Sequence, residues 1–380
     1  MKLLLALIFF SISRCVFAQQ MHIGLLTEFD IKKLKINKAI GNYHVMTDST
    51  YLGFANSTDI IDVIYVSPNK MTVNFQGNSY DNINNLFLYA LFEEQSIQLT
   101  GISPGFNSRQ YEGDFEISAG KSGVRVINNI DLEAYLEGVI ESEAGSSQHY
   151  EYYKVQAIIS RTYAKKNEGK HKLEGFQLCD KVHCQVYHNK RLNNPIIDSA
   201  VSNTGHQILS DKNDKYAPTF FSANCGGQTC NPSYIWKESI EGLTSFKDTF
   251  CVYSKQATWT KSIPYIDWVT FIVKKYNFPI DDSLSLQLLN NYKQDERQAF
   301  YIDPSYGIPL KELREKFKLK STYFSVRKDG EYMVISGRGF GHGVGLCQEG
   351  AMKMARTNYT CNQIIKFYFP DYLISKIIYN

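Results

Sequence analysis

Short runs in which apolar and polar residues alternate fill the chain from residue 19 to about residue 123. Runs with this pattern lie at 22–26, 43–46, 60–66 and 71–75. Asn, Asp, Gly and Ser residues separate them, as is typical of turns between strands. The period of two predicts a β-rich N-terminal domain over 19–123, either a small barrel or a sandwich.

The apolar period changes to that of a helix a few residues later. A short β-prone run at Val124, Val126 and Ile127 comes first, followed by a predicted turn at Asn128-Asn129. The apolar face that follows consists of Leu132, Tyr135, Leu136, Val139 and Ile140. These positions recur at helix spacing, so we expect a helix here.

Acidic residues lie off the apolar face of this predicted helix. We interpret Glu133, Glu137 and Glu141 as a solvated face. The helical pattern breaks at 144–147, an Ala-Gly-Ser-Ser run. Glu143 therefore sits at the mouth of a helix–turn–helix corner, where a side chain can point into a cleft.

A second helix is predicted from about residue 149 to residue 166, with Ser146 or Ser147 as its cap. Its buried side is marked by Val155, Ile158, Ile159 and Thr162. Lys154 and Arg161 alternate with alanines in the neighbouring stripe. This stripe is either a surface that a ligand can approach closely or a basic helix face in water.

The C-terminal part of the chain mixes both periods. Residues 258–329 predict an accessory α/β segment within a mixed α/β domain over 124–380. The elements expected in this part are helices at 266–276, 309–317 and 346–357, strands at 323–326 and 332–335, and a short helix and final strand within 364–379. Together with the β-rich domain, this pattern predicts an α+β fold.

Glycine alternates with other residues over 337–345, GRGFGHGVG. The run lacks the Gly-Lys-Ser/Thr of a phosphate loop. Alternating glycines let the backbone reach a flat ligand, with Arg338, Phe340 and His342 as the side chains beside it. The alternative is a close-packed crossing of two elements, and the two interpretations are compatible.

Residues 1–18 combine Lys2 with an apolar run and a Val-Phe-Ala ending, which predicts a secretory signal peptide cut after Ala18. Lipid attachment at Cys15 is the alternative, although Arg14 fits such a site poorly. We expect no transmembrane segment after it, and a location in the periplasm or cell envelope. The formal charge of +3 falls to +1 without the leader, which argues against nucleic acid as a partner.

Seven cysteines remain beyond residue 18. His171, Cys179 and Cys184 have the spacing and donor types of a Zn²⁺ site, with a fourth position left for water or substrate. A disulfide between Cys179 and Cys184, or from either to Cys225, is the competing interpretation. His183 or His188 could replace His171.

A second group of cysteines is Cys225, Cys230 and Cys251, which we expect to include a disulfide. Cys225 with a base such as His206 could also form a thiol nucleophile, but nothing in the sequence fixes such a pair in space.

Six stretches of this chain resemble the SpoIID/LytB family, that is, sporulation stage II protein D and the amidase-enhancer proteins. They appear in the family's order and span more than half of the chain. The stretches are YLEGVIESE (135–143), KVQAIISRTYA (154–164), HCQVY (183–187), FSANCGGQTCNPSYIW (221–236), LKSTYFSV (319–326) and GRGFGHGVGLCQEGA (337–351).

The resemblance implies action on bacterial peptidoglycan, by lytic transglycosylation of glycan strands stripped of stem peptides. It implies Glu143 as the general acid/base, with Lys154 and Arg161 holding the substrate. The matching motifs supply further substrate-binding candidates, namely Gln185, Arg338, His342 and Gln348. Some members of the family carry zinc where His171, Cys179 and Cys184 stand, and others do not. The runner-up function is a non-catalytic wall-binding protein that recruits or enhances a cell-wall amidase.

The chain departs from the family pattern at two places. Ala144-Gly145 follows Glu143 where many members have an apolar residue and a proline, which loosens the turn beside the presumed acid. Cys347 and Glu349 stand where Ser and Tyr are common.

Overall fold

The structure is a computed structural model that describes residues 19–92, 94–192 and 194–377, so the predicted signal peptide lies outside the described residues. The chain divides into two compact units. The first unit ends at Ser146 and resumes over Asn167–Gly205, and the second holds Ser147–Lys166 and the chain from His206 onward. The division runs through the helix–turn–helix corner, which the sequence placed inside one domain.

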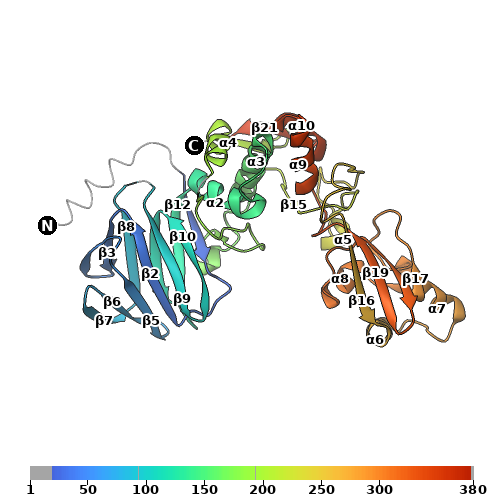
Figure 1. The fold of residues 1–380 in the computed structure, drawn as a ribbon, viewed down its shortest axis with the longest axis horizontal. Coiled ribbons are helices and arrows are strands. Elements are labelled where there is room, and N and C mark those ends of the chain that lie inside the picture. Colours follow the sequence, from blue (N-terminus) through green and yellow to red (C-terminus); the bar gives the residue numbers. More distant parts are fainter. Residues whose placement is uncertain (1–18, 93, 193, 378–380) are drawn as a thin grey trace. The chain divides into compact units, whose positions relative to one another are not determined.

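Two sheets form most of the first unit (Figure 1). The seven-stranded sheet has the order β13-β1-β12-β11-β8-β3-β4. Its strands are β1 (Gln20–Leu25), β3 (Tyr43–Thr47), β4 (Tyr51–Ala55), β8 (Asn85–Ala90), β11 (Asp114–Ala119), β12 (Val124–Asp131) and β13 (Leu178–Cys179). Strand β13 pairs parallel with β1, and the remaining pairs in this sheet are antiparallel.

The six-stranded sheet has the order β10-β9-β2-β5-β6-β7. Its strands are β2 (Lys33–Ile40), β5 (Ile61–Ser67), β6 (Lys70–Phe75), β7 (Asn78–Ile83), β9 (Ser96–Ser103) and β10 (Gly105–Glu112). Burial alternates along β6, where Met71, Val73 and Phe75 are buried, and along β11, where Phe115 and Ile117 are buried. Because β11 contacts β5 and β6, these alternate side chains form a core between the sheets. The predicted β-rich N-terminal region is confirmed.

The helices of the first unit follow β12. They are α2 (Leu132–Ala144), the 3-10 helix η1 (Lys172–Glu174) and α4 (Pro195–Asn203). Helix α2 packs on α4. The turn predicted at Asn128-Asn129 is wrong: both residues continue β12 and pair with β1 and β11. Asn128 is buried and its amide donates to the Glu112 carbonyl at 2.7 Å, which explains a polar residue inside the strand.

Helix α3 (Tyr150–Lys166) is the most deeply buried helix element of the second unit. It packs against α9 (Gln348–Arg356), α10 (Cys361–Tyr368) and β14 (Gln207–Ser210), and β14 pairs with β21 (Leu373–Lys376). The predicted serine cap is wrong, because α3 begins at Tyr150 and the His149 ring accepts a hydrogen bond from the Glu151 N–H at 3.3 Å.

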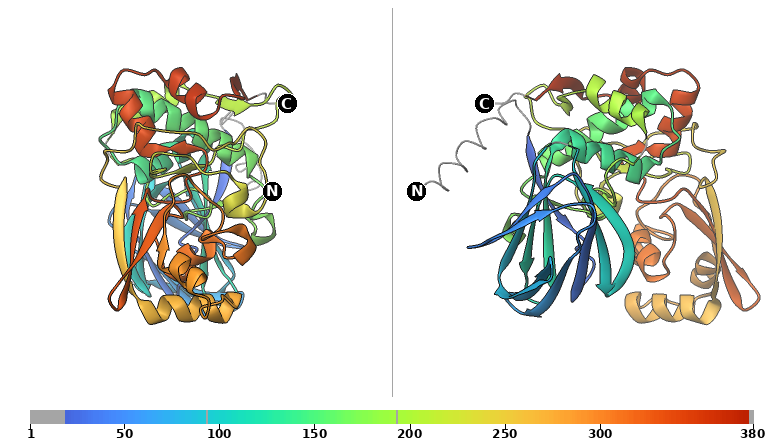
Figure 2. Two further views of the ribbon diagram at one scale, coloured as in Figure 1. Left: turned by 90° about the vertical axis from the view of Figure 1, so that its right-hand side faces the viewer. Right: turned by 60° about the vertical axis from the view of Figure 1, so that its left-hand side comes forward.

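The accessory segment has its own sheet and core, seen from two sides in Figure 2. The sheet order is β16-β19-β18-β17. Its elements are β16 (Thr258–Pro264), α6 (Tyr265–Tyr276), α7 (Ser283–Asn290), β17 (Asn291–Tyr292), η2 (Pro304–Tyr306), α8 (Leu310–Lys316), β18 (Phe324–Asp329) and β19 (Tyr332–Arg338). Trp268 is fully buried against Tyr301 and Phe317. The mixed α+β architecture is as predicted.

Three short elements connect this sheet to the α3 region: β15 (Phe221–Ser222), α5 (Ser233–Trp236) and β20 (Leu346–Cys347). Strands β15 and β20 pair parallel, Phe221 with Leu346 and Ser222 with Cys347. Among the residues that the structure describes, we find no helix with the length and apolar character to cross a membrane.

Candidate functional site

Glu143 lies in the last turn of α2, and both ends of that helix are defined by local chemistry. The Asp131 carboxylate caps the start by accepting from the Glu133 N–H at 2.9 Å. Gly145 ends the helix with a φ of 73°, and its N–H donates to the Glu141 carbonyl at 2.9 Å. Glu143 therefore sits on a rigid element immediately before a break in the backbone.

The Glu143 carboxyl is half-buried and makes one well-formed hydrogen bond. Its Oε1 accepts from the backbone N–H of Val186 at 2.8 Å. Burial raises the pKa of Glu143, and the Val186 N–H opposes that rise without cancelling it. A carboxyl whose pKa is raised in this way holds its proton closer to neutrality, which is the property of a general acid.

Other side chains near the end of α2 bind the segment that follows Val186, residues 188–192. Ser142 Oγ accepts from the His188 N–H at 3.2 Å, and Glu141 Oε2 accepts from the Leu192 N–H at 2.7 Å. Glu137 pairs with Arg191 at 2.7 Å. The predicted solvated face is thus wrong for Glu137 and Glu141, because both carboxylates bind residues of this segment.

The predicted zinc ligands come together in the first unit, with one residue added. We name His171, Cys179, His183 and Cys184 the imidazole–thiol cluster; one donor atom from each lies within 4.8 Å of the others. The Cys184 Sγ lies 3.4 Å from His171 Nε2 and 3.8 Å from His183 Nδ1. Both His171 and His183 belong to the cluster. The His183 imidazole therefore supplies a fourth donor, where the sequence predicted water or substrate.

The surroundings of the imidazole–thiol cluster fit a metal ion. His171 Nδ1 is 2.6 Å from Glu174 Oε1, so a carboxylate orients the ring and leaves Nε2 facing the thiols. Hydrogen bonding between the two thiols lowers the pKa of Cys179 and raises that of Cys184, so this pair favours one thiolate. Strand pairing of Cys179 with Gly24 fixes one end of the cluster. This donor set can hold a metal ion, and two sulfurs with two imidazoles are ligands that Zn²⁺ prefers.

The cluster and the acid are connected through the backbone. Cys184 belongs to the imidazole–thiol cluster, and the backbone N–H of Val186, two residues later, donates to Glu143. Anything that fixes the loop around Cys184 therefore fixes the hydrogen-bond donor of the carboxyl.

Gln185 lies between these two residues and is fully buried. Its Oε1 is 3.5 Å from the Tyr135 hydroxyl, and its Nε2 has no hydrogen-bond partner among the described residues. Gln185 is therefore not exposed in this structure, and its substrate-binding role stays a prediction.

Lys154 and Arg161 belong to the second unit and differ in burial and in the partners they bind. Lys154 is half-buried and pairs with Glu151 at 2.7 Å. Arg161 is fully buried, and its guanidinium donates to the Gln207 carbonyl at 2.9 Å. Arg161 thus joins α3 to β14 and is not exposed in this structure, and its substrate-binding role stays a prediction.

The glycine run 337–345 supports the packing interpretation. Gly339, Gly341, Gly343 and Gly345 all have positive φ, between 71° and 102°. A Cβ on Gly345 would lie 2.1 Å from the Phe220 carbonyl oxygen, so only glycine fits there. The run crosses the segment that starts at β15 with almost no space between the backbones.

The three substrate-binding candidates in and just after this run, Arg338, His342 and Gln348, occupy three environments. Arg338 is exposed, with its guanidinium 4.2 Å from the Tyr323 ring centroid. Burial lowers the pKa of His342 to about 4, so the ring is neutral, and it lies 5.4 Å from the Trp236 ring. Gln348 is buried, and its Nε2 has no partner among the described residues. Arg338 is thus the member of this group that solvent reaches freely.

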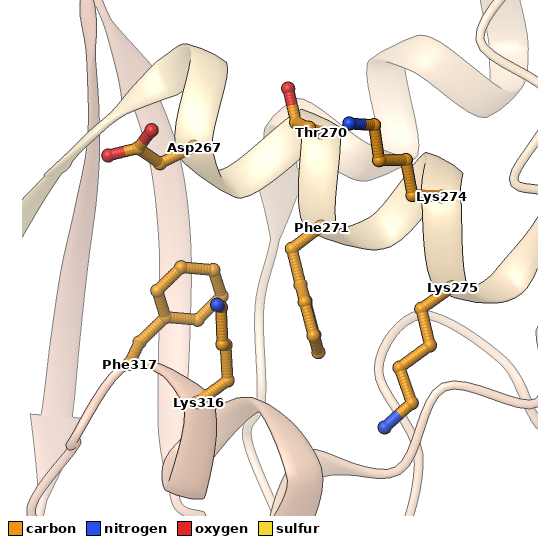
Figure 3. Close-up of a pocket in the computed structure, with 7 residues that line it drawn as sticks. All are labelled: Asp267, Thr270, Phe271, Lys274, Lys275, Lys316 and Phe317. Carbon is orange, nitrogen blue, oxygen red and sulfur yellow. The ribbon is translucent and has the colours of Figure 1, made fainter.

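A surface hollow of about 790 Å³ lies on the accessory segment (Figure 3). It is lined by Asp267, Thr270, Phe271, Lys274, Lys275, Lys316 and Phe317. None of the predicted site residues lines it. Its lysines project from α6 and α8 around Phe271, and it contains no pair of groups suited to acid–base chemistry.

Comparison with known proteins places these features in a class concerned with the bacterial cell wall. Residues 120–210, which include Glu143 and the imidazole–thiol cluster, match the family model for the stage II sporulation protein SpoIID. This SpoIID match, together with the similarity to stage II sporulation protein D and to the amidase enhancer, supports the SpoIID/LytB family for this chain.

Three relatives illustrate the match. Stage II sporulation protein D of Bacillus subtilis is 28% identical over 265 residues, which are 66% of this chain and 76% of that protein. An uncharacterized protein of Brachyspira hyodysenteriae is 27% identical over 268 residues, 69% of this chain and 72% of the relative. The amidase enhancer of Bacillus subtilis is 27% identical over 285 residues, 62% of this chain and 39% of that protein.

Some parts of the site escaped the sequence interpretation. The Val186 contact is made by a backbone N–H, which leaves no mark on residue type. Glu174 stands three residues after His171, a helical spacing that could have indicated its orienting role. The expected disulfides are absent from the described residues, where all seven cysteines are free thiols.

Proposed function

We propose that this protein is a secreted lytic transglycosylase that cleaves peptidoglycan strands between N-acetylmuramic acid and N-acetylglucosamine. The observation that supports this most is the half-buried Glu143 carboxyl, whose pKa is raised by burial and whose orientation is fixed by the Val186 N–H. Secretion rests on the leader pattern of residues 1–18.

In this proposal one carboxyl carries out both proton transfers. Protonated Glu143 donates to the glycosidic oxygen as the bond to the anomeric carbon breaks. The resulting carboxylate then takes the proton of the muramic acid 6-hydroxyl, whose oxygen bonds to the same anomeric carbon. The product is a 1,6-anhydro sugar, water is not consumed, and Glu143 regains its proton.

The neighbouring carboxylates favour this scheme over hydrolysis. Two-carboxylate glycosidases need a second Asp or Glu as nucleophile or base. On α2, Glu137 is paired with Arg191, and Glu141 accepts from the Leu192 N–H. Neither is available to activate water beside Glu143.

A Zn²⁺ ion fits the imidazole–thiol cluster and is part of the proposal. His171, Cys179, His183 and Cys184 would supply four ligands, a closed set typical of structural zinc. Such an ion stabilises the loop. The Val186 N–H, carried by that loop, then holds the Glu143 carboxyl.

The test is product analysis on glycan strands freed of stem peptides. Wild type is expected to release fragments ending in 1,6-anhydromuramic acid, identified by mass spectrometry. Glu143→Gln keeps the acceptor for Val186 but removes the titrating proton, so turnover should fall by about 10²-fold or more. A reducing-end product would instead indicate hydrolysis.

The second candidate is a wall-binding protein that enhances an amidase. It is favoured by the similarity to the amidase enhancer of Bacillus subtilis. If wild type yields neither product, while wild type and Glu143→Gln accelerate a cell-wall amidase equally, the enzyme proposal is wrong and the enhancer function replaces it.

A further inference from the structure

A second group of metal-type donors lies in the other unit and has no role in the proposed reaction. We name Cys225, Asp248, Cys251 and Cys347 the thiol–carboxylate cluster. One donor atom from each lies within 4.8 Å of the others, and all four residues are fully buried. Cys225 follows β15, Asp248 and Cys251 share one loop, and Cys347 ends β20 and caps α9. Three separate segments therefore converge on one point.

The distances between the donor atoms match a single tetrahedral ion. The Cys225 Sγ lies 3.5 Å from the Cys251 Sγ and 3.3 Å from Asp248 Oδ2. Two thiolates bound to zinc at about 2.3 Å stand roughly 3.8 Å apart in a tetrahedron, so small shifts complete the geometry. An iron–sulfur cluster distributes its cysteines over several irons and needs more widely separated donors.

Charge gives a second and independent reason for a cation. A buried carboxylate is costly unless it is paired or coordinates a metal. None of the salt bridges found among the described residues involves Asp248. A disulfide between Cys225 and Cys251 would leave the carboxylate and the third thiol without a cation, whereas a divalent ion compensates all four donors.

Hydrogen bonds around the cluster orient the donors as in a metal site. The Tyr368 hydroxyl donates to Asp248 Oδ2 at 2.9 Å, and the Phe250 N–H donates to Oδ1 at 3.0 Å. The Cys347 Sγ accepts from the N–H groups of Cys225 at 3.2 Å and Gly350 at 3.4 Å. Such donors stabilise a thiolate, which is the form of cysteine that binds metals.

We propose that the thiol–carboxylate cluster is a structural Zn²⁺ site that joins β15, the loop at 248–251 and the start of α9. Binding releases the thiol protons to solvent and forms three Zn–S bonds and one Zn–O bond. Three thiolates with one carboxylate suit borderline-soft Zn²⁺ better than Mg²⁺ or Ca²⁺, which take oxygen ligands. The ion clamps the close crossing between the glycine run and the segment after β15.

Elemental analysis of the full chain, produced without a polyhistidine tag, tests the proposal. Wild type should carry about two Zn²⁺ per chain, one in each cluster. Cys347→Ser should lose one ion and keep the other, and Cys184→Ser should lose the ion of the imidazole–thiol cluster instead. Cys230→Ser and Cys361→Ser are matched controls, because both residues are buried cysteines outside the clusters, and both variants should retain the wild-type metal content.

Two results overturn the proposal. One is a folded Cys347→Ser variant with undiminished zinc. The other is a Cys225–Cys251 disulfide peptide recovered from wild type that was denatured in the presence of an alkylating agent. If Cys347→Ser does not fold, Cys184→Ser protein is loaded with Co²⁺ and its thiolate-to-cobalt absorption is recorded. An absorption that the added substitution Asp248→Asn shifts or abolishes supports the site. Absence of that absorption contradicts it.

Discussion

The two clusters of metal-type donors contrast in burial, in donor type and in what lies next to them. The imidazole–thiol cluster includes the exposed His183 and the half-buried His171, and its loop continues into the residue that holds Glu143. The thiol–carboxylate cluster is closed to solvent and joins distant parts of the chain. Under the two proposals above, similar donor chemistry positions a reactive group in one unit and stabilises a backbone crossing in the other.

The largest expected effect that separates the clusters is on catalysis. Cys184→Ser should lower transglycosylase turnover by about 10- to 100-fold, the usual scale when a residue that supports a site is lost, because the loop carrying Val186 is no longer fixed. Cys347→Ser should leave the rate at low temperature near the wild-type value. Turnover on denuded glycan at 20 °C, with folding checked by circular dichroism, measures both. Equal rate losses in two folded variants would remove the distinction.

The second-largest expected difference between the two clusters is the rate at which each releases its metal ion. The imidazole–thiol cluster can lose its ion through exposed His183, whereas the thiol–carboxylate cluster must first open the core. Zinc transfer to a chromogenic chelator should therefore be biphasic, with rates separated by about tenfold or more. The fast phase should vanish in Cys184→Ser and the slow phase in Cys347→Ser. A single phase in wild type would show that burial does not control release.

A glycine substitution should test the crossing that the buried cluster clamps. Gly345→Ala and Gly330→Ala both force a side chain onto a positive φ, but only Gly345 faces a backbone carbonyl, since nothing lies within 4 Å of a Cβ on Gly330. Gly345→Ala should lower the melting temperature by several degrees more than its control, on the scale of about 2–4 °C per kcal/mol for a compact unit of roughly 150–250 residues. Equal shifts in thermal unfolding would mean that the crossing is looser than described.

The smallest expected effect concerns Glu143 itself. Because burial raises its pKa, the folded state binds this proton more tightly than the unfolded chain does. The protonated Glu143 carboxyl makes its whole contribution to the free energy of unfolding below the pKa of the unfolded chain. That contribution is lost as pH rises through the pKa of the folded state. Glu143→Gln, which cannot ionise, should therefore melt slightly above wild type at pH 7, with the gap closing as pH falls to about 4. Calorimetry across this range that finds the gap widening on acidification would contradict the raised pKa.

The fold and the first cluster could be predicted because their signals are local. Period-two runs predicted the β-rich region, and helix spacing predicted α2 and α3. His171, Cys179 and Cys184 lie within one short stretch, so their spacing alone indicated a metal site.

The rest depended on contacts between distant positions. Cys225 and Cys347 are 122 residues apart, and their meeting depends on the parallel pairing of β15 with β20, which no local pattern indicates. The burial of Arg161 was missed for a similar reason, because its carbonyl partner at Gln207 carries no side-chain signal. The pattern of apolar residues identifies helices and strands, whereas tertiary packing decides which polar side chains are exposed to solvent.

The hydrogen bond from Val186 to Glu143 has a consequence for how this chain can change over time. The donor is an amide common to nineteen of the twenty residue types, so the side chain at position 186 can drift without moving the carboxyl. Proline is the exception, since it has no N–H to donate. Most replacements of Val186 therefore keep the N–H that holds the Glu143 carboxyl, whereas proline at position 186 would remove it.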